Sequence, residues 1–295
     1  MSSDFTGLAS DEPTLDPRTD GIDPFFTFDF QAYAEPDDAT QRWSNWLDVE
    51  PLCRGPEPRP DWVVIDQAAV DTELGILKTG KEADVFLVER AVDGGPSVVM
   101  AAKRYRSREH TTFHRSAAYT EGWSTRRSRD ARAVKAKTTF GRELAAGQWA
   151  NSEWEALKRF WLAGAPVPYP VQIDGTEILM EFIEVDGDAA PRLAQTRPEP
   201  DLLLSYFEQL REAMALLVQH GIVHGDLSPY NILAAGEKLV IIDLPQAVDV
   251  VGNSQGPDFL MRDCTNICTW FRRRGLAAEV ADEHALFGDL IATAF

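Results

Sequence analysis

Three short apolar runs separated by tight turns, between residues 72 and 105, limit the folds open to this chain more than any other feature. The stretch ELGILKTGKEADVFLVERA has apolar residues on both sides of a Thr-Gly-Lys turn, and SVVMAAKRY follows the turn DGGP. Runs of this kind, bounded by Gly and Pro, are typical of adjacent β-strands. A further hairpin is expected in VQIDGTEILMEFIE, turned at Asp174-Gly175. The first half of the chain is therefore predicted to be rich in strands.

One long helix is predicted within this strand-rich half, and helices dominate the second half. In GQWANSEWEALKRFWLAG, tryptophans and other apolar residues recur at helical spacing, and Gly164 is expected to end the helix. Residues 201–220 are strongly amphipathic, and further helices are expected across about 256–274 and 278–293. These patterns predict an α+β protein of two lobes, with an antiparallel sheet plus one helix in the first lobe and a reduced, mainly helical second lobe.

The composition allows a sizeable core, because 44% of the 295 residues are hydrophobic. The formal net charge of -18 makes a general attraction to nucleic acid or to an anionic membrane unexpected. The charge is uneven: residues 1–60 hold 13 acidic and 4 basic side chains, whereas residues 103–142 hold 12 basic and 3 acidic ones. We therefore predict an acidic, partly disordered N-terminal tail over 1–60 and a flexible basic loop over 106–140 that can contact an anionic partner.

The lobes are expected to span 61–184 and 185–295, because EVDGDAAPRLAQTRPEP at their junction is rich in Pro, Asp and Ala. The three cysteines lack the spacing of a disulfide framework, as expected in a reducing compartment, and Cys264 and Cys268 are interpreted as helix packing rather than as metal ligands. The chain has no signal-peptide pattern and no run of 18 apolar residues. A cytoplasmic protein with no membrane partner is predicted.

The segment HGDLSPYNIL, from His224 to Leu233, places Asp226 and Asn231 five residues apart between apolar runs. One interpretation is a turn in which both side chains cap backbone N–H groups. The other is a phosphoryl-transfer loop, in which Asp226 orients an attacking hydroxyl and Asn231 helps to hold Mg²⁺. Asp243 ends the apolar run VIID and can supply a second ligand. Two carboxylates and an amide at hairpin ends repel one another without a cation, which favours the second interpretation.

Lys103 lies near the end of the apolar run VVMAAK, and a buried lysine there needs anionic partners. The α- and β-phosphates of a nucleotide satisfy this need, with a helix carboxylate holding the amine in place. Glu153 is the preferred carboxylate because it shares a helix face with Leu157, and Glu155 is the alternative. Gly80 lets the backbone approach phosphates, although a Thr-Gly-Lys turn is also common in hairpins.

Taken in order, TGKEADVF, the strand lysine, the helix glutamate, HGDLSPYNIL and IIDLPQAVD resemble the RIO family of atypical serine/threonine protein kinases, particularly its first branch. The later segment DFLMRDCTNICTWF also resembles that family's C-terminal helix, so the resemblance spans residues 72–275. It implies that Lys103 contacts phosphates, that Glu153 pairs with it and that Asp226 is the catalytic aspartate. It also implies that Asn231 and Asp243 bind Mg²⁺, or Mn²⁺ in its place.

The same resemblance implies an ATP site. The phosphate-covering loop it predicts consists of Thr79, Gly80, Lys81 and Glu82. Met180 is expected at the back of the adenine pocket. The connector that offers backbone hydrogen bonds to the base is expected to consist of Glu181, Phe182 and Ile183. The basic loop 106–140 matches the family's flexible loop, whose hydroxyl groups are candidates for autophosphorylation.

The acceptor of the phosphate is left open by the sequence. Leu244-Pro245 replace the Phe-Gly that follows the metal aspartate in typical protein kinases, and only 52 residues follow Asp243, too few for the usual activation segment. The resemblance implies a serine/threonine protein kinase, an ATPase, or both, acting on a protein substrate or on itself, with Asp243 as a further possible acceptor. It also suggests a ribosomal partner for the basic loop 106–140.

Two alternatives remain. A small-molecule phosphotransferase of the aminoglycoside or choline kinase type shares the HGDxxxxN pattern and a later Asp, and an acidic chain could attract a cationic substrate. TGKEADVF, the basic loop and the short C-terminal part argue against it. The third hypothesis is a binding protein that uses nucleotide only as a conformational switch. The presence of all five expected polar residues argues against this one.

Overall fold

The computed structural model describes residues 39–106, 139–244, 247–250 and 252–294. These residues all belong to one compact unit, Glu35–Phe295. The aromatic part of the predicted tail, residues 25–30, and nearly all of the basic loop 106–140 lie outside the described residues. The structural predictions for these two segments therefore stay predictions.

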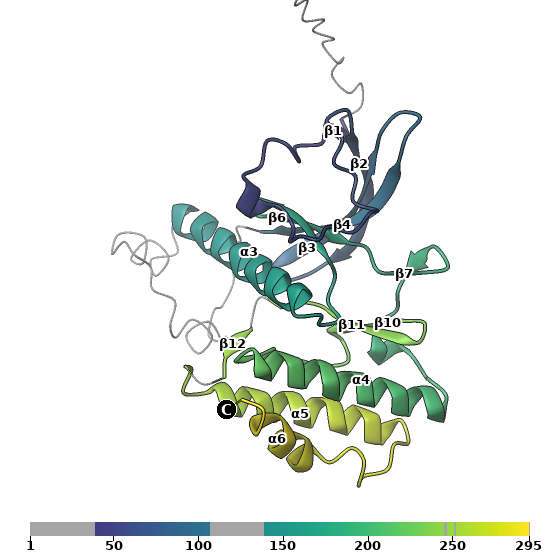
Figure 1. Ribbon diagram of the computed structural model, residues 1–295, viewed down its shortest axis with the longest axis vertical. Coiled ribbons are helices and arrows are strands. Elements are labelled where there is room, and N and C mark those ends of the chain that lie inside the picture. The colour runs from purple at the N-terminus through teal and green to yellow at the C-terminus, as the bar shows by residue number, and fades with distance from the viewer. Residues whose placement is uncertain (1–38, 107–138, 245–246, 251, 295) are drawn as a thin grey trace, which may run out of the picture. The chain divides into compact units, whose positions relative to one another are not determined.

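An antiparallel six-stranded sheet forms the first lobe, in the order β1-β2-β3-β4-β6-β5 (Figure 1). Its strands are β1 (Gln41–Trp43), β2 (Val70–Thr79), β3 (Ala83–Ala91), β4 (Ser97–Tyr105), β5 (Pro170–Asp174) and β6 (Glu177–Glu181). Both predicted hairpins are present, since β2 pairs with β3 and β5 pairs with β6. Because β4 lies between β3 and β6, the end that carries Lys103 is in the interior of the sheet.

The folded body begins before residue 61, because part of the predicted tail contributes β1, the 3-10 helix η1 (Pro51–Cys53) and a buried tryptophan. Trp46 is only 4% exposed and packs in a small cluster with Val88 and Met100 of the sheet. The apolar residues of this stretch are sparse and have neither strand nor helix periodicity. The sequence pattern therefore gave no indication that the folded part of the chain includes residues before 61.

The helix α3 (Thr139–Leu162) packs against β4, β5 and β6. Its buried face carries Trp154, Leu157 and Phe160, none of them more than 1% exposed. The helix begins earlier than the predicted residue 147 and ends next to Gly164 as expected. Gly164 has a φ of +82°, a left-handed conformation that glycine adopts without steric cost.

The second lobe is mainly helical, as predicted. Its helices are α4 (Pro200–Gln219), α5 (Gly256–Arg273) and α6 (Glu283–Ile291), which lie side by side in Figure 1. The remaining short elements are β7 (Glu184–Val185), β8 (Asp188–Ala189), η2 (Leu193–Gln195), β9 (Ile222–Val223), β10 (Ile232–Ala235), β11 (Lys238–Ile241) and β12 (Val248–Asp249). The hairpin β10–β11 turns at Gly236 as expected, and β9 pairs with β12.

The core of this lobe explains the two helical cysteines. Phe207 of α4 and Phe271 of α5 meet edge to face, with ring centroids 5.1 Å apart. Cys264 and Cys268 are fully buried in the same core, and burial raises the pKa of their thiols to about 12 and about 11. They therefore pack as small apolar residues. No helix in the described part of the chain is both long and apolar enough to cross a membrane.

Candidate active site

Lys103 joins three elements that are distant in the sequence. Its Nζ donates to Glu153 Oε1 at 2.7 Å and to Asp243 Oδ1 at 2.7 Å, so β4, α3 and the segment after β11 meet at this ammonium. The side chain of Lys103 is 13% exposed and that of Glu153 is 2% exposed. Glu155, the alternative partner, instead faces outward and pairs with Lys158. The structure thus places Glu153, rather than Glu155, beside Lys103.

The carboxylate of Glu153 is fully engaged. Besides Lys103, it accepts hydrogen bonds from the Tyr105 hydroxyl and, at 3.3 Å, from the Leu244 N–H. Burial raises the pKa of Tyr105 well above its usual range, and the neighbouring Glu153 charge raises it further. Tyr105 was not among the predicted site residues. A signal for it existed, because residues two apart on a strand share a face and Lys103 already pointed inward.

The charge of Lys103 is secured by its two partners. Burial alone lowers the pKa of a lysine, but the Asp243 and Glu153 carboxylates outweigh this effect and hold the pKa of Lys103 above its ordinary value. The ammonium is therefore protonated at neutral pH. One of its partners, Asp243, has a side chain that is 47% exposed, so this group of charges opens to solvent on the Asp243 side.

Asp243 occupies an unusual backbone conformation. Its φ is +68°, in the left-handed region that aspartate tolerates better than most side chains. This turn sends the carboxylate to Lys103 while the next residue, Leu244, is fully buried. Burial acts to raise the pKa of Asp243, but the adjacent Lys103 charge dominates and lowers the pKa below its ordinary value. Asp243 is therefore ionised and faces the open side of the site.

The segment 224–231 is held by its own hydrogen bonds and by the strand that leads to Asp243. Asn231 Nδ2 donates to the Asp226 backbone carbonyl at 2.9 Å, and the Ile242 N–H donates to the Asn231 carbonyl at 3.0 Å. His224 Nε2 lies 3.1 Å from the Ile242 carbonyl oxygen, so the imidazole braces the loop against the segment that leads to Asp243. Because its amide nitrogen is committed to the loop, Asn231 has its Oδ1 left to bind a cation.

Asp263 holds this loop in place through hydrogen bonds, and it was not among the site residues predicted from the sequence. Its Oδ2 accepts from the Gly225 N–H at 2.9 Å and its Oδ1 from the Leu227 N–H at 2.8 Å, the two amides that flank Asp226. The residue is 1% exposed, and burial raises the pKa of its carboxyl to about 6. The available signal was its place on α5 among buried residues, where a lone Asp needs a partner.

The predicted phosphate-covering loop follows β2 directly. Thr79 ends the strand, and the Gly80 N–H donates to the Ala83 carbonyl at 3.0 Å. A Cβ at Gly80 would lie 2.6 Å from that carbonyl oxygen, so only glycine fits this tight turn. Lys81 and Glu82 are exposed. Burial by the surrounding protein raises the pKa of Glu82, with contributions from the Asp243 and Asp226 charges, so the loop lies near both carboxylates.

The residues predicted on the adenine side lie on β6 and in the segment that follows it, and some of their hydrogen-bonding groups are already used. Met180 is buried on β6 opposite Ala101. The Glu181 N–H donates to the Tyr169 carbonyl at 2.8 Å, and its carboxylate accepts from the Tyr169 N–H. The Ile183 carbonyl accepts from the Ala190 N–H at 2.9 Å. Within the described residues, the connector donors left without a hydrogen-bond partner are the N–H groups of Phe182 and Ile183.

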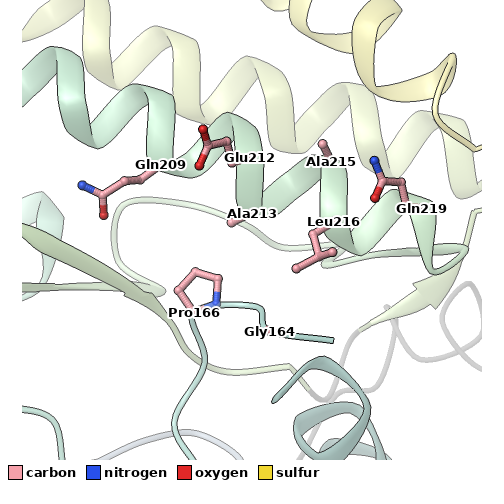
Figure 2. A pocket seen from close by; sticks show the side chains of 8 residues that line it. All are labelled: Gly164, Pro166, Gln209, Glu212, Ala213, Ala215, Leu216 and Gln219. Carbon is pink, nitrogen blue, oxygen red and sulfur yellow. The ribbon is translucent and has the colours of Figure 1, made fainter. Parts of the chain in front are cut away.

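A surface cavity lies away from this site. It has a volume of about 540 Å³ and is bounded by the link after α3 and by one face of α4 (Figure 2). Pro166 and Leu216 face into it from the two sides, and Gln209 and Glu212 line its rim. None of the predicted site residues lines it. The site is therefore defined by convergent polar groups and not by this hollow.

Comparisons with known proteins agree with this geometry. The family model described as "RIO domain" matches residues 84–285. The "RIO-type serine/threonine-protein kinase Rio1" of Haloferax volcanii is 35% identical over 73% of this chain and 69% of its own length. The chain belongs to the RIO family. The "Serine/threonine-protein kinase RIO1" of Chaetomium thermophilum is 30% identical, and its alignment with this chain covers 72% of this chain but only 42% of that protein.

A comparison with solved structures supports the fold. The crystal structure of the Rio2 kinase from Chaetomium thermophilum matches with a TM-score of 0.50 and 21% identity, over 75% of this chain and 72% of that one. It confirms the two-lobed kinase-like fold. The predicted RIO resemblance and the serine/threonine kinase assignment are confirmed by the named relatives, and RIO kinases use ATP with a divalent metal. Nothing in the comparisons favours a small-molecule phosphotransferase.

Proposed function

We propose that this RIO kinase binds ATP with Mg²⁺ and transfers the γ-phosphoryl group to a serine or threonine hydroxyl that Asp226 orients. The observation that carries the proposal is the pair of 2.7 Å bonds from Lys103 to Glu153 and Asp243. They bring a phosphate-binding cation and a metal-binding carboxylate to one point. Asn231 belongs to the same loop as Asp226 and donates a hydrogen bond to the Asp226 backbone carbonyl. The proposed metal ligand and the proposed acceptor-orienting carboxylate are therefore held together.

Nucleotide binding is supported from both ends of the site. At one end the Lys103 ammonium is protonated and held by Glu153, and it offers its remaining donor capacity to phosphate oxygens. At the other end the unused N–H groups of Phe182 and Ile183 follow the buried Met180, as adenine recognition requires. Gly80 allows the loop between them to approach phosphates closely. Together these groups suit an adenosine nucleotide.

The donor set suits a hard divalent cation. Asp243 offers an exposed carboxylate and Asn231 an amide oxygen, and oxygen ligands in small number are typical of Mg²⁺ bound together with substrate phosphates. Among the described residues, no three His, Cys, Asp or Glu side chains gather closely enough to hold a metal by themselves. The bound cation supplies charge neutralisation on the β- and γ-phosphates. We propose Mg²⁺ as the ion used.

The residues of the chain then position the reaction. Asp226 accepts the proton of the acceptor hydroxyl as the new O–P bond forms and the bond to the ADP oxygen breaks. Asp263 fixes Asp226 by holding the amides on either side of it. Lys103 stabilises the phosphates. When water takes the place of the hydroxyl, the same arrangement hydrolyses ATP, so kinase and ATPase activity share one mechanism.

The acceptor belongs to this proposal as well. We propose a protein hydroxyl, on a substrate or on the chain itself. Transfer to the Asp243 carboxylate is the competing hypothesis suggested by the family resemblance, and it makes a distinct, acid-labile acyl phosphate. An anionic or ribosomal partner for segment 106–140 stays a prediction, because the segment lies almost wholly outside the described residues.

The test is incubation with γ-labelled ATP and Mg²⁺, followed by mapping of the labelled residues and of free phosphate. Wild-type protein should label a hydroxyl or release phosphate, and Asp226→Ala should lower turnover by about 10²–10⁴ while still binding nucleotide. Glu155→Gln is the matched control for Glu153→Gln, since only Glu153 contacts Lys103. Wild-type turnover in Asp226→Ala, or equal turnover in the two glutamate variants, would contradict the proposal.

A further inference from the structure

Lys78 lies on the same face of the sheet as Lys103. In the antiparallel ladder Lys78 of β2 is opposite Val85 of β3, and Val85 is opposite Lys103 of β4. Residues directly opposite one another project to the same side of a sheet. An irregularity between Ile76 and Lys78 sets this register. Lys78 therefore faces the site and precedes the phosphate-covering loop by one residue.

Arg192 approaches the site from the second lobe. Its guanidinium donates from Nη1 to the Tyr230 carbonyl, and its backbone bridges to Leu233, so it lies against the end of the loop that carries Asn231. The residue lies between β8 and η2, in the segment that follows the connector from the first lobe. Arg192 is thus fixed beside the predicted metal ligand by groups that leave its charge uncompensated.

The pKa values of Lys78 and Arg192 are both shifted by burial and by neighbouring charges. Partial desolvation at the surface lowers the pKa of Lys78, and the Arg192 charge lowers it further. Burial also lowers the pKa of Arg192, and the Asp243 charge partly restores it. Within the described part of the chain, neither Lys78 nor Arg192 has a carboxylate within ion-pair distance. Asp243 itself is already bonded to Lys103.

Two cations that both lie near Asp243, and that have no carboxylate partner among the described residues, suit an anion between them. We propose that Lys78 and Arg192 bind the phosphate groups of ATP from opposite lobes, in addition to Lys103. The nucleotide then connects the β2 strand to the end of the catalytic loop. This inference deepens the proposed function and rests on ATP binding at the site.

The test measures binding of Mg-ATP and of uncharged adenosine to the full chain by calorimetry or by competition. Lys78→Met and Arg192→Leu should each weaken Mg-ATP binding by about tenfold, as expected for loss of a charge-assisted phosphate contact, and leave adenosine binding unchanged. Lys238→Met and Arg197→Leu are matched controls, since both residues are exposed and outside the site. They should bind both ligands like the wild type.

Several outcomes separate this inference from the proposed function. Binding of Mg-ATP within twofold of the wild type in both Lys78→Met and Arg192→Leu overturns the inference while leaving the proposed function intact. Equal loss of ATP and adenosine in Arg192→Leu also overturns it, because the residue then only supports the loop through Tyr230. A wild-type chain that binds no ATP contradicts the proposed function itself. Lys78 is exposed, so Lys78→Met is expected to fold normally and keeps the test decisive even if Arg192→Leu is unstable.

Discussion

Asp243 and Asp263 both lie at the candidate site, but one carboxylate is exposed and the other is buried. Asp243 stands on the open side, 47% exposed, with the pKa of its carboxyl lowered by Lys103. Asp263 lies beneath the catalytic loop, 1% exposed, with the pKa of its carboxyl raised by burial to about 6. The Asp243 carboxylate is thus open to solvent, whereas the Asp263 carboxylate accepts hydrogen bonds from buried backbone amides.

This difference in environment predicts different roles: Asp243 takes part in the proposed reaction, whereas Asp263 positions the loop that carries Asp226. Asp243 bonds to Lys103 on the exposed side of the site, so under the proposed function its loss should remove activity and leave the fold. Asp263 accepts hydrogen bonds from the Gly225 and Leu227 amides, so its loss should weaken the fold and affect activity through the position of Asp226. The two aspartates therefore give a pair of variants whose effects on turnover and on stability should differ in ratio.

The largest effect is expected for Asp243→Asn. Asparagine has the same shape and tolerates the left-handed backbone at this position, so only the charge is lost. Turnover should fall by about 10³-fold because the metal and the phosphates lose a preorganised charge. The melting temperature should change by only a few degrees. Steady-state kinetics and thermal unfolding measure the two quantities, and a variant that keeps its turnover would remove Asp243 from the chemistry.

The second effect is that of Asp263→Ala on stability. This change leaves the two amides flanking Asp226 buried without acceptors, at a cost of about 3 kcal/mol in the free energy of unfolding. Turnover should also fall, because the loop is no longer held, but less than in Asp243→Asn. Urea unfolding followed by tryptophan fluorescence provides the measurement. If Asp263→Ala unfolds like the wild type, the anchoring role is wrong.

Sequence patterns singled out Asp243 as a candidate site residue and gave no indication of Asp263. Asp243 follows an apolar strand and accompanies Asp226 and Asn231 in a recognisable order, so a role for it could be predicted from local context. Asp263 lies far along the chain from the amides that it holds, and only the packing of α5 brings it beneath the loop. A long-range contact of this kind leaves no periodic or motif signal.

The same distinction holds for the fold. Hairpins β2–β3 and β5–β6 were predicted because a turn and its flanking strands are local in sequence. The contribution of β1 and Trp46 to the sheet was missed, since it depends on pairing with β2 across an intervening irregular stretch. The free N–H groups of Phe182 and Ile183 also emerged only from the structure, because Tyr169 and Ala190 occupy the neighbouring groups.

The smallest effect, and the sharpest test of the comparison, is the dependence of stability on pH. Asp263 has a folded-state pKa near 6, above its ordinary value of 3.8. Protonation of Asp263 therefore favours the folded state: this contribution to stability is fully present below about pH 4 and is lost as the pH rises through 6. The loss should amount to roughly 2–3 kcal/mol in the free energy of unfolding.

Asp243 should show the opposite slope. Its pKa is lowered in the folded state, so its contribution is present above the ordinary value of 3.8 and is lost as the pH falls through the folded-state pKa. The free energy of unfolding of the wild type, Asp243→Asn and Asp263→Ala is measured in urea between about pH 3.5 and 7. At each pH, the difference between the wild type and a variant gives the contribution of the carboxyl that the variant lacks. The wild-type advantage over Asp263→Ala should shrink from pH 4 to 6, while its difference from Asp243→Asn should change only at the acid end. Parallel profiles would mean that the two aspartates lie in similar electrostatic surroundings, contrary to the structure.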